Sequence, residues 1–539
     1  SFLLRLLVSL LCCAAASSSQ SLQLTNCNAS ALNAVNNAAT LTTLSLIRCH
    51  LPELKATGTL QRFGQLLRLE VSHCALGELT ASALNGLTRL RRLSLAHNNI
   101  SELQSWSQDT LAGLNSLDVS HNRIVLLAAL SFAAYPQLQE LNLGHNLIAK
   151  LDANSFHGLL HLKQLQLHEN RLQQLDGNCF HGLQRLHSLS LQHNLISGIE
   201  ATAFESNTHL RTLRLEHNQI SSLQFLHNPG LSRLVLLNLS SNALTTLAPS
   251  GFAHNVELQY LDLSFNQLLR LANDSFSGLD LLELINVSHN SVVELDGDCL
   301  QPLGTLQKLD MSHNQLTALP EQLFQATTQL RVIDLSHNQL QKLPTEWLKQ
   351  LLHLNRLNLA QNRLDDAAWL QHMATALNRL TLRIDLSSNR IRSLNLSSLA
   401  HFEHVQLADN RWDCLWLARH MLRTPPATLS FDRAWPMLSG WSEDLLNVRG
   451  IDCFDGEQNR SIVLLNVGVE KQKLKSCNCE ASGDDIGPLT PPLTWPKIRT
   501  DRFDSRSVII WMLVAIALAF AGLRWAQRFV ERKEVSRKL

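Results

Sequence analysis

Apolar and polar residues alternate in short runs along most of this chain, and the runs return at a fixed interval. The recurring pattern is L-x-x-L-x-L-x-x-N-x-L, and the copy that starts at Leu138 carries Ile148 in the last place. Such a period is typical of a repeat array. Twelve of its asparagines follow one another at a constant spacing of 24 residues: Asn98, Asn122, Asn146, Asn170, Asn194, Asn218, Asn242, Asn266, Asn290, Asn314, Asn338 and Asn362.

Four further copies extend the array to about sixteen units over residues 41–412. Cys49 and Cys74 hold the asparagine position in two earlier copies, and Asn389 and Asn410 hold it after spacings of 27 and 21 residues. The alternation within each unit predicts a short strand with one buried face, and neighbouring strands can pair only side by side in a parallel sheet.

The recurring asparagine and a large apolar residue further along each unit suggest how the chain turns and how the interior is filled. The chain must turn sharply after each strand, and an Asn amide can satisfy buried backbone groups of its own turn and the next one. Because no unit buries enough apolar surface alone, stability should be a sum over interfaces between neighbours. A large apolar residue ten positions after the asparagine is predicted to fill the far side of the coil: Phe132, Phe156, Phe180, Phe204, Phe252, Phe276, Leu300, Phe324 and Leu348.

From about residue 41 to residue 410 this motif closely resembles that of the leucine-rich repeat family, in its extracellular class of 24-residue repeats. The resemblance implies an α/β fold, a leucine-rich repeat solenoid shaped as a horseshoe, with a parallel sheet on the concave face and cysteine-containing caps. It implies a binding function and leaves the ligand open.

The amino-terminal region reads as a signal peptide at 1–16, which ends in small residues, followed by a cap at 17–40. Cys27, just ahead of the first unit, is expected either to pair with Cys49 or to leave Cys49 as a small buried thiol like Cys74. Cys179 and Cys299 are five units apart, about 25 Å, which is too far for a disulfide, so we expect buried free thiols.

A second cap is expected at 413–479. The stretch around Trp412 and Cys414 resembles the start of the cysteine-rich cap of extracellular leucine-rich repeat arrays, although Trp416 stands where a second cysteine is usual. On that resemblance we favour a bond between Cys414 and Cys453. Cys477 and Cys479 stay open, including to a second chain in a homodimer or heterodimer. The cap is also weakly similar to that of mosquito leucine-rich repeat immune proteins.

The carboxyl-terminal segments predict a membrane anchor. A Pro-containing stalk at 480–507 precedes a span at 508–525 whose first sixteen residues carry no charge, and a basic cytoplasmic tail at 526–539 follows. We therefore expect a single-pass plasma-membrane protein, anchored in the lipid bilayer, with its amino terminus outside. Seven sequons fit a glycoprotein: Asn28, Asn99, Asn238, Asn273, Asn286, Asn395 and Asn459.

Charge and motifs argue against catalysis and nucleic-acid binding. With 46 basic and 45 acidic residues the net charge is +1, which gives no electrostatic case for nucleic acid. No metalloprotease, serine-hydrolase or phosphate-loop motif occurs, so we expect a non-enzyme without cofactor or metal. A column of histidines directly precedes the recurring Asn of the units, which we call the ladder position: His73, His97, His121, His145, His193, His217, His289, His313 and His337. Neighbouring histidines could hold a metal or act as a switch near pH 6. The alternative, which we favour, is that the position merely tolerates a polar residue.

Outward strand positions are mostly small or charged, with recurring Asp and Ser, and one strip departs from this. Leu236, Tyr260 and Leu284 hold the same outward position in three consecutive units, with Val235 beside them. Exposed apolar strips tend to be contact sites, so we predict partner binding there. The alternative is an incidental strip, or one sheltered by sugars on Asn238 and Asn286.

Two functions remain. The first is a cell-surface protein that binds an extracellular or cell-surface protein ligand through its solenoid, in recognition, adhesion or as a receptor. The second is an innate-immune receptor or co-receptor, of the Toll-ectodomain or mosquito immune type.

Overall fold

The computed structural model describes residues 20–453 apart from gaps at 55–59, 80, 104–110, 128–129, 345, 371–380, 396–398, 400–401, 422–428, 432–445 and 449–450. The predicted signal peptide, stalk, membrane span and basic tail lie outside these residues, as do Cys477, Cys479 and Asn459. Among the helices that are described, none combines the length and apolar character that a bilayer crossing needs.

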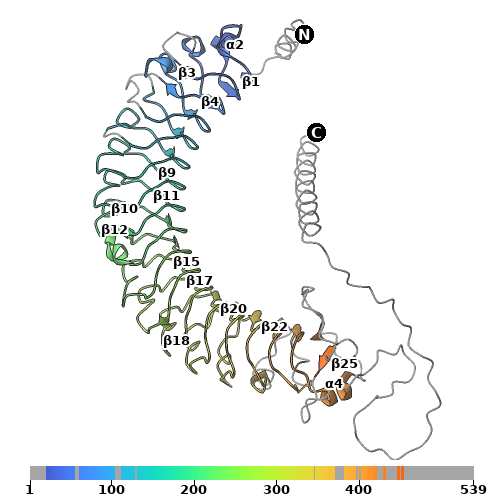
Figure 1. Ribbon diagram of the computed structural model, residues 1–539. Helices are drawn as coiled ribbons and strands as arrows, with labels where there is room; N and C mark the ends of the chain where they lie inside the picture. The colour runs from blue at the N-terminus through green and yellow to red at the C-terminus, as the bar shows by residue number, and fades with distance from the viewer. Residues whose placement is uncertain are drawn as a thin grey trace, which may run out of the picture. The chain divides into compact units, whose positions relative to one another are not determined.

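One parallel sheet runs through the array, with a strand from each unit. Figure 1 shows β9, β11, β15 and β17 on the inner side of the curve that the array follows, and β10, β12 and β18 on its outer side. In the described residues the sheet has 18 strands: β1 (Ser21–Thr25), β2 (Thr43–Ile47), β4 (Arg68–Ser72), β6 (Arg92–Ser94), β7 (Ser116–Asp118), β8 (Glu140–Asn142), β9 (Gln164–Gln166), β11 (Ser188–Ser190), β13 (Thr212–Arg214), β14 (Leu236–Asn238), β15 (Tyr260–Asp262), β17 (Leu284–Asn286), β19 (Lys308–Asp310), β20 (Val332–Asp334), β21 (Arg356–Asn358), β22 (Arg383–Asp385), β23 (His404–Gln406) and β24 (Leu429–Ser430).

The sheet extends one strand beyond the predicted array at each end. β1, from the amino-terminal cap, pairs in parallel with β2, and β24 pairs in parallel with β23. The caps therefore cover the apolar ends of the solenoid partly by continuing its sheet.

The return segments on the outer side are mostly turns, so the helical half expected of an α/β fold is nearly missing from the described residues. Short parallel pairs and 3-10 turns take its place there. The remaining elements are α2 (Ala29–Asn33), α4 (Cys414–Met421), the 3-10 helices η1 (Ala38–Thr40), η2 (Gln61–Phe63), η3 (Ala81–Leu84), η4 (Gln224–His227) and η5 (Pro229–Leu231), the parallel pairs β3 (Glu53–Leu54) with β5 (Glu78–Leu79), β10 (Gln174–Leu175) with β12 (Gly198–Ile199) and β16 (Arg270–Leu271) with β18 (Glu294–Leu295), and an antiparallel pair, β25 (Leu446–Val448) with β26 (Ile451–Cys453).

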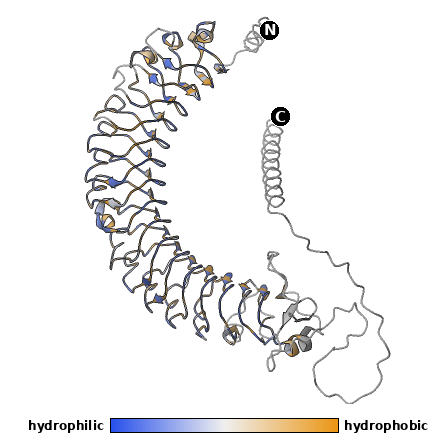
Figure 2. Cartoon of the chain, viewed as in Figure 1, coloured by the Kyte–Doolittle hydropathy of each residue, from blue (hydrophilic) through white to orange (hydrophobic). Residues whose placement is uncertain are grey.

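The core is a continuous column of leucines lined on its far side by stacked phenylalanines. Figure 2 shows hydrophobic and hydrophilic residues alternating along the turns of the array. Phe132, Phe156, Phe180 and Phe204 are almost fully buried, and their successive ring centroids lie 6.2, 6.1 and 5.5 Å apart. This confirms the predicted spine.

Each ladder asparagine links its own turn to the preceding unit, as Asn266 illustrates. Its Nδ2 donates to the carbonyls of Leu263 and Ser264 in its own turn and, at 3.0 Å, to that of Leu239 one unit earlier. Its Oδ1 accepts the backbone N–H of Leu244, also in the preceding unit, at 3.0 Å. The predicted role is confirmed, but the bridge runs backward along the chain and not to the next turn.

Cysteines occupy three kinds of position in the described residues. Cys27 and Cys49 form a disulfide, which settles the alternatives for the amino-terminal cap, whereas the Cys74 thiol donates to the carbonyls of Leu46 and Ser72 in place of an amide. Cys179 and Cys299 are free and buried as expected, and burial raises the pKa of each to about 12. Both thiols are therefore unreactive at neutral pH.

The residues expected to open the carboxyl-terminal cap pack closely around α4. Trp412 is buried and stacks on Trp416 at a centroid distance of 5.2 Å, and the Asp413 carboxylate accepts the backbone N–H of Trp416 at the start of α4. Cys414 is disulfide-bonded. Its pairing with Cys453 stays a prediction, because the side chains of β26 lie outside what the structure describes.

The histidine column has a backbone cause. The residue before each ladder asparagine adopts a left-handed conformation, with φ between 53° and 57° at the nine histidines. Histidine, like Asn and Asp, is enriched in that region, which accounts for its recurrence. Two stacks result. His73, His97, His121 and His145 stack with centroids 3.8–4.3 Å apart. Phe265, His289, His313 and His337 stack at 3.8–4.1 Å.

Replacing Asn266 by Leu should destabilise the array although Leu is more apolar. The backbone groups that Asn266 satisfies would lose their partners in a dry interior, at about 1–3 kcal/mol for each group. The melting temperature and surface expression of Asn266→Leu should both fall. Gln267→Leu, at the exposed neighbouring position, is the matched control. Equal stability of the two variants would refute the ladder's role.

Acidification toward pH 5.5 should lower the free energy of unfolding. Burial lowers the pKa of His97, His121 and His313, and neighbouring imidazoles lower it further. Since these pKa values lie below the unfolded value, the stability is complete above about pH 6.5 and is lost as pH falls through the folded-state pKa.

The measurement is the melting temperature between pH 7.5 and 5.5. In His121→Asn, which keeps a side chain suited to the left-handed backbone, the pH dependence should be shallower than in the wild type. His254→Asn, an exposed histidine outside both stacks, should keep the wild-type slope. Identical slopes in all three proteins would contradict the assignment.

Candidate functional site

The predicted apolar strip lies on the inner sheet with its residues in register. Leu236 of β14 pairs with Tyr260 of β15, and Tyr260 pairs with Leu284 of β17. Tyr260 is 40% exposed, while Leu236, Leu284 and Val235 are half-buried. The three side chains thus form a continuous apolar surface across three strands, which we call the apolar strip.

A groove runs beside the apolar strip, where the strands begin. Its volume is about 400 Å³, which is enough for several side chains. Leu281, 48% exposed, supplies an apolar wall. The other lining residues are polar and include those that directly precede Tyr260, Leu284, Lys308 and Val332: Gln259, Glu283, Thr305, Gln307, Gln329 and Arg331.

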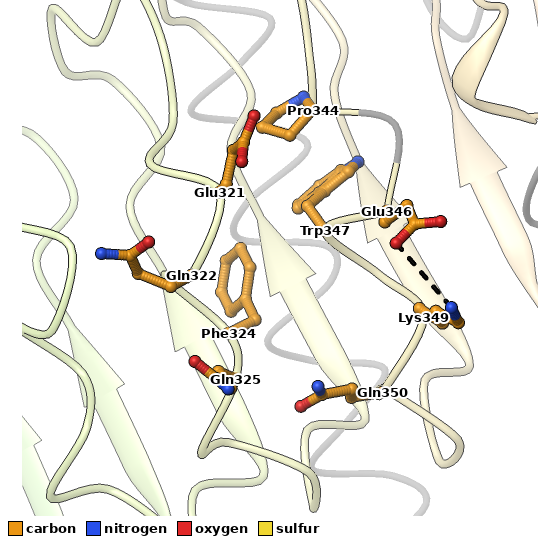
Figure 3. Close-up of a pocket in the computed structure, with 9 residues that line it drawn as sticks. All are labelled: Glu321, Gln322, Phe324, Gln325, Pro344, Glu346, Trp347, Lys349 and Gln350. Carbon is orange, nitrogen blue, oxygen red and sulfur yellow. Dashed lines mark ion pairs between the residues drawn. The ribbon is translucent and has the colours of Figure 1, made fainter.

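Another hollow lies on the return segments of two neighbouring units. It has a volume of about 590 Å³, against about 400 Å³ for the groove beside the apolar strip. Figure 3 shows Phe324 and Trp347 in its middle, with Glu346 and Lys349 ion-paired at one side. Both aromatic rings are buried in the core, so neither offers a free face to a ligand. No residue predicted from the sequence as a site lies there.

The recurring Asp and Ser of the outward positions are hydrogen-bonded to each other. In β15 the Asp262 carboxylate accepts the backbone N–H of Ser264 at 2.9 Å and its hydroxyl at 2.6 Å, and Asp310 holds Ser312 in the same way. The sequence showed these positions only as small or charged. In the structure these carboxylates fix the ends of their strands.

Three consecutive units break this arrangement, a feature that the repeat pattern did not predict. From Asp118 to Asp385 the other units carry Asp or Asn at the first position, and its side chain accepts the backbone N–H two residues later. In the exceptional units the pairs are Gln166 with His168, Ser190 with Gln192, and Arg214 with Glu216. The break is visible in the sequence once the units are aligned, and we call His168, Gln192 and Glu216 the polar row.

Two predicted glycosylation sites border the apolar strip. Asn238 ends β14 and Asn286 ends β17, each two residues after a leucine of the strip, and each Oδ1 accepts the backbone N–H of the serine in its sequon. Of the other described sequons, Asn28 caps α2, and Asn99, Asn273 and Asn395 are exposed. Use of any sequon stays a prediction.

The histidine stacks do not form a metal centre. Within the residues that the structure describes, no group of three or more His, Cys, Asp or Glu side chains is placed to hold a metal ion. Parallel rings point their nitrogens side by side, whereas a metal needs ligands that converge on one point.

Solved structures of similar fold include three repeat proteins. The TLR13–ssRNA13 complex is 24% identical with a TM-score of 0.63, and the alignment covers 76% of this chain and 56% of that one. The Toll–Spatzle complex of Drosophila is 18% identical, TM-score 0.61, covering 75% and 63%. A leucine-rich repeat protein of Leptospira interrogans is 25% identical, TM-score 0.57, covering 68% and 90%. The chain thus spans less than two thirds of the first two.

Sequence comparison identifies the family directly. Curated proteins give no match to the full sequence. The family model described as leucine rich repeat matches in overlapping windows that together cover residues 64–382, which is more than half of the chain. The chain belongs to the leucine-rich repeat family.

Proposed function

We propose that this protein is a single-pass cell-surface protein that binds another protein on the concave face of its solenoid. The observation that carries the proposal is the apolar strip, in which Leu236, Tyr260 and Leu284 stand in register in three consecutive units of a face that is mostly polar. Aromatic and aliphatic anchors of this kind commonly contribute most of the energy of a protein interface.

The groove beside the apolar strip supports the same surface. Gln259 and Glu283 line the groove and directly precede Tyr260 and Leu284, so the polar groove and the apolar anchors are adjacent. An apolar centre with a polar edge is the usual arrangement of a protein-binding surface. The histidine flank is a weaker candidate, because the left-handed backbone already explains its composition.

The membrane anchor is part of the proposal and rests on sequence. The uncharged stretch from Val508 to Leu523 is followed by Arg524, Arg528 and further basic residues, and such residues favour the cytoplasmic side. A stalk at 480–507 would then hold the solenoid outside the cell.

A receptor or co-receptor role in innate immunity is the second candidate. It is suggested by the fold similarity to Toll, whose complex with Spatzle is described as a hub in Drosophila development and innate immunity. Induced expression or a changed infection outcome after deletion of the gene would favour this role over adhesion.

Tags at two positions test the orientation. A tag inserted at Gly487 should be stained on unpermeabilised cells, and a tag after Leu539 should be stained only after permeabilisation, because the basic residues favour the cytoplasmic side. Flow cytometry gives the measurement, and the reverse staining would overturn the proposed topology.

The double variant Tyr260→Asp with Leu284→Asp should lose partner capture. Two carboxylates in place of the apolar anchors would have to be desolvated on binding, so capture should fall at least about tenfold. Proximity labelling on intact cells, quantified for wild type and variant, gives the measurement.

The matched control is Leu160→Asp with Leu352→Asp, which introduces the same charges at two exposed leucines outside the sheet. Surface display and melting temperature should be unchanged in both double variants. If the strip variant captures the same proteins as the wild type, the concave site is wrong.

A further inference from the structure

The polar row places three large side chains at a position where the other units from Asp118 to Asp385 carry a small residue. In the other units from Asp118 to Asp385 that position holds Ser, Gly or Ala, whereas three neighbours carry the large polar side chains of His168, Gln192 and Glu216. Their strands are consecutive, since β9 pairs with β11 and β11 pairs with β13. A change shared by three adjacent units, and by no other unit from Asp118 to Asp385, is not required by the solenoid.

Each member of the polar row has a polar atom without a partner. His168 Nδ1, Gln192 Oε1 and Glu216 Oε2 are buried, and none has a hydrogen bond in the described part of the chain. An unsatisfied buried polar group costs stability, so three such atoms in a row require an explanation. The residues themselves are only half-buried, so a rotation of these side chains, as is common when a partner binds, presents the three atoms to a group on the concave side.

The neighbouring residues that the structure describes do not satisfy the three unpartnered atoms, which therefore remain available to a ligand. A Cβ at Gly144 would collide with the His168 imidazole, so the glycine makes room for that ring. The neighbouring Glu169 is ion-paired with His145 at 3.0 Å. Arg214 lies two residues before Glu216 on the same face, and within the described residues it forms no ion pair with Glu216.

The chemistry of the three atoms selects a hydrogen-bond donor. Gln192 Oε1 and the Glu216 carboxylate accept hydrogen bonds, and burial, with the nearby His145 second, lowers the pKa of His168, which leaves its ring neutral and able to accept. Strands about 4.8 Å apart place the outer two residues about 10 Å apart. One ammonium nitrogen, with bonds of about 2.9 Å, bridges acceptors at most about 6 Å apart. A guanidinium presents five donors on three nitrogens and reaches further, and the rotatable side chains of Gln192 and Glu216 can close the remaining distance.

We propose that His168, Gln192 and Glu216 together bind the guanidinium group of an arginine side chain, supplied by the protein that docks on the apolar strip. The second half of this statement rests on the proposed function. The polar row lies two residues after the ends of β9, β11 and β13, and the apolar strip lies on β14, β15 and β17, so the two patches occupy six consecutive units of one sheet. One partner can therefore place an arginine and apolar side chains on the two patches at once.

The experiment uses the purified full chain in detergent and two small probes, L-arginine amide and L-citrulline amide. Citrulline has the same shape with an uncharged ureido group in place of the guanidinium. Saturation-transfer NMR should give saturable binding of arginine amide, and none of citrulline amide. Glu216→Gln, which keeps the shape of the side chain, should weaken arginine amide at least about tenfold, because a charge-assisted hydrogen bond is lost.

Glu140→Gln is the matched control, because Glu140 is an exposed carboxylate of β8 on the same face, and it should bind like the wild type. The variants His168→Ser and Gln192→Ser restore the common small residue and should also weaken binding without loss of folding. Equal binding of the two probes, no saturation, or wild-type affinity in Glu216→Gln would each overturn the site.

The strip variant separates this proposal from the proposed function. Tyr260→Asp with Leu284→Asp should retain arginine amide binding, since it leaves the polar row intact. If arginine amide binds but the strip variant still captures the partner, the docking surface is wrong and the guanidinium site stands. If arginine amide does not bind while the strip variant loses capture, the reverse holds.

Discussion

The solenoid depends on one requirement, that the backbone groups of every turn find partners in an interior without water. The ladder amides meet it by joining each turn to the unit before it, as Asn266 does through Leu239 and Leu244. Because every amide needs a turn one period away, the spacing of the asparagines follows from hydrogen bonding. Apolar packing of leucines and phenylalanines then adds stability along an already aligned stack.

Because the ladder amides and the apolar core stabilise the solenoid from inside, the outward side chains of the inner sheet are available for binding. Most units nonetheless use two outward positions for structure, through carboxylates such as Asp262 that fix the strand end. Function is therefore to be sought where units depart from the common arrangement. The apolar strip and the polar row are two such departures, and they lie on adjacent strands of the same sheet.

The sequence predicted what repeats locally and missed what depends on neighbours in space. The period predicted the parallel sheet, the phenylalanine spine and the in-register position of Tyr260. The backward direction of the amide bridges, the added strands β1 and β24 and the sparse helix of the return segments depend on how turns meet in three dimensions. The polar row was missed because Asp and Ser looked like free surface until their mutual bonds were known.

The two irregular units have a practical consequence for engineering. Arg356 of β21 still pairs with Arg383 of β22 across the 27-residue unit, and Arg383 with His404 of β23 across the 21-residue unit. Length changes are therefore absorbed between the strands, and the inner register is kept. A reporter or an extra domain could be grafted into a return segment of such a unit without shifting any residue of the recognition face.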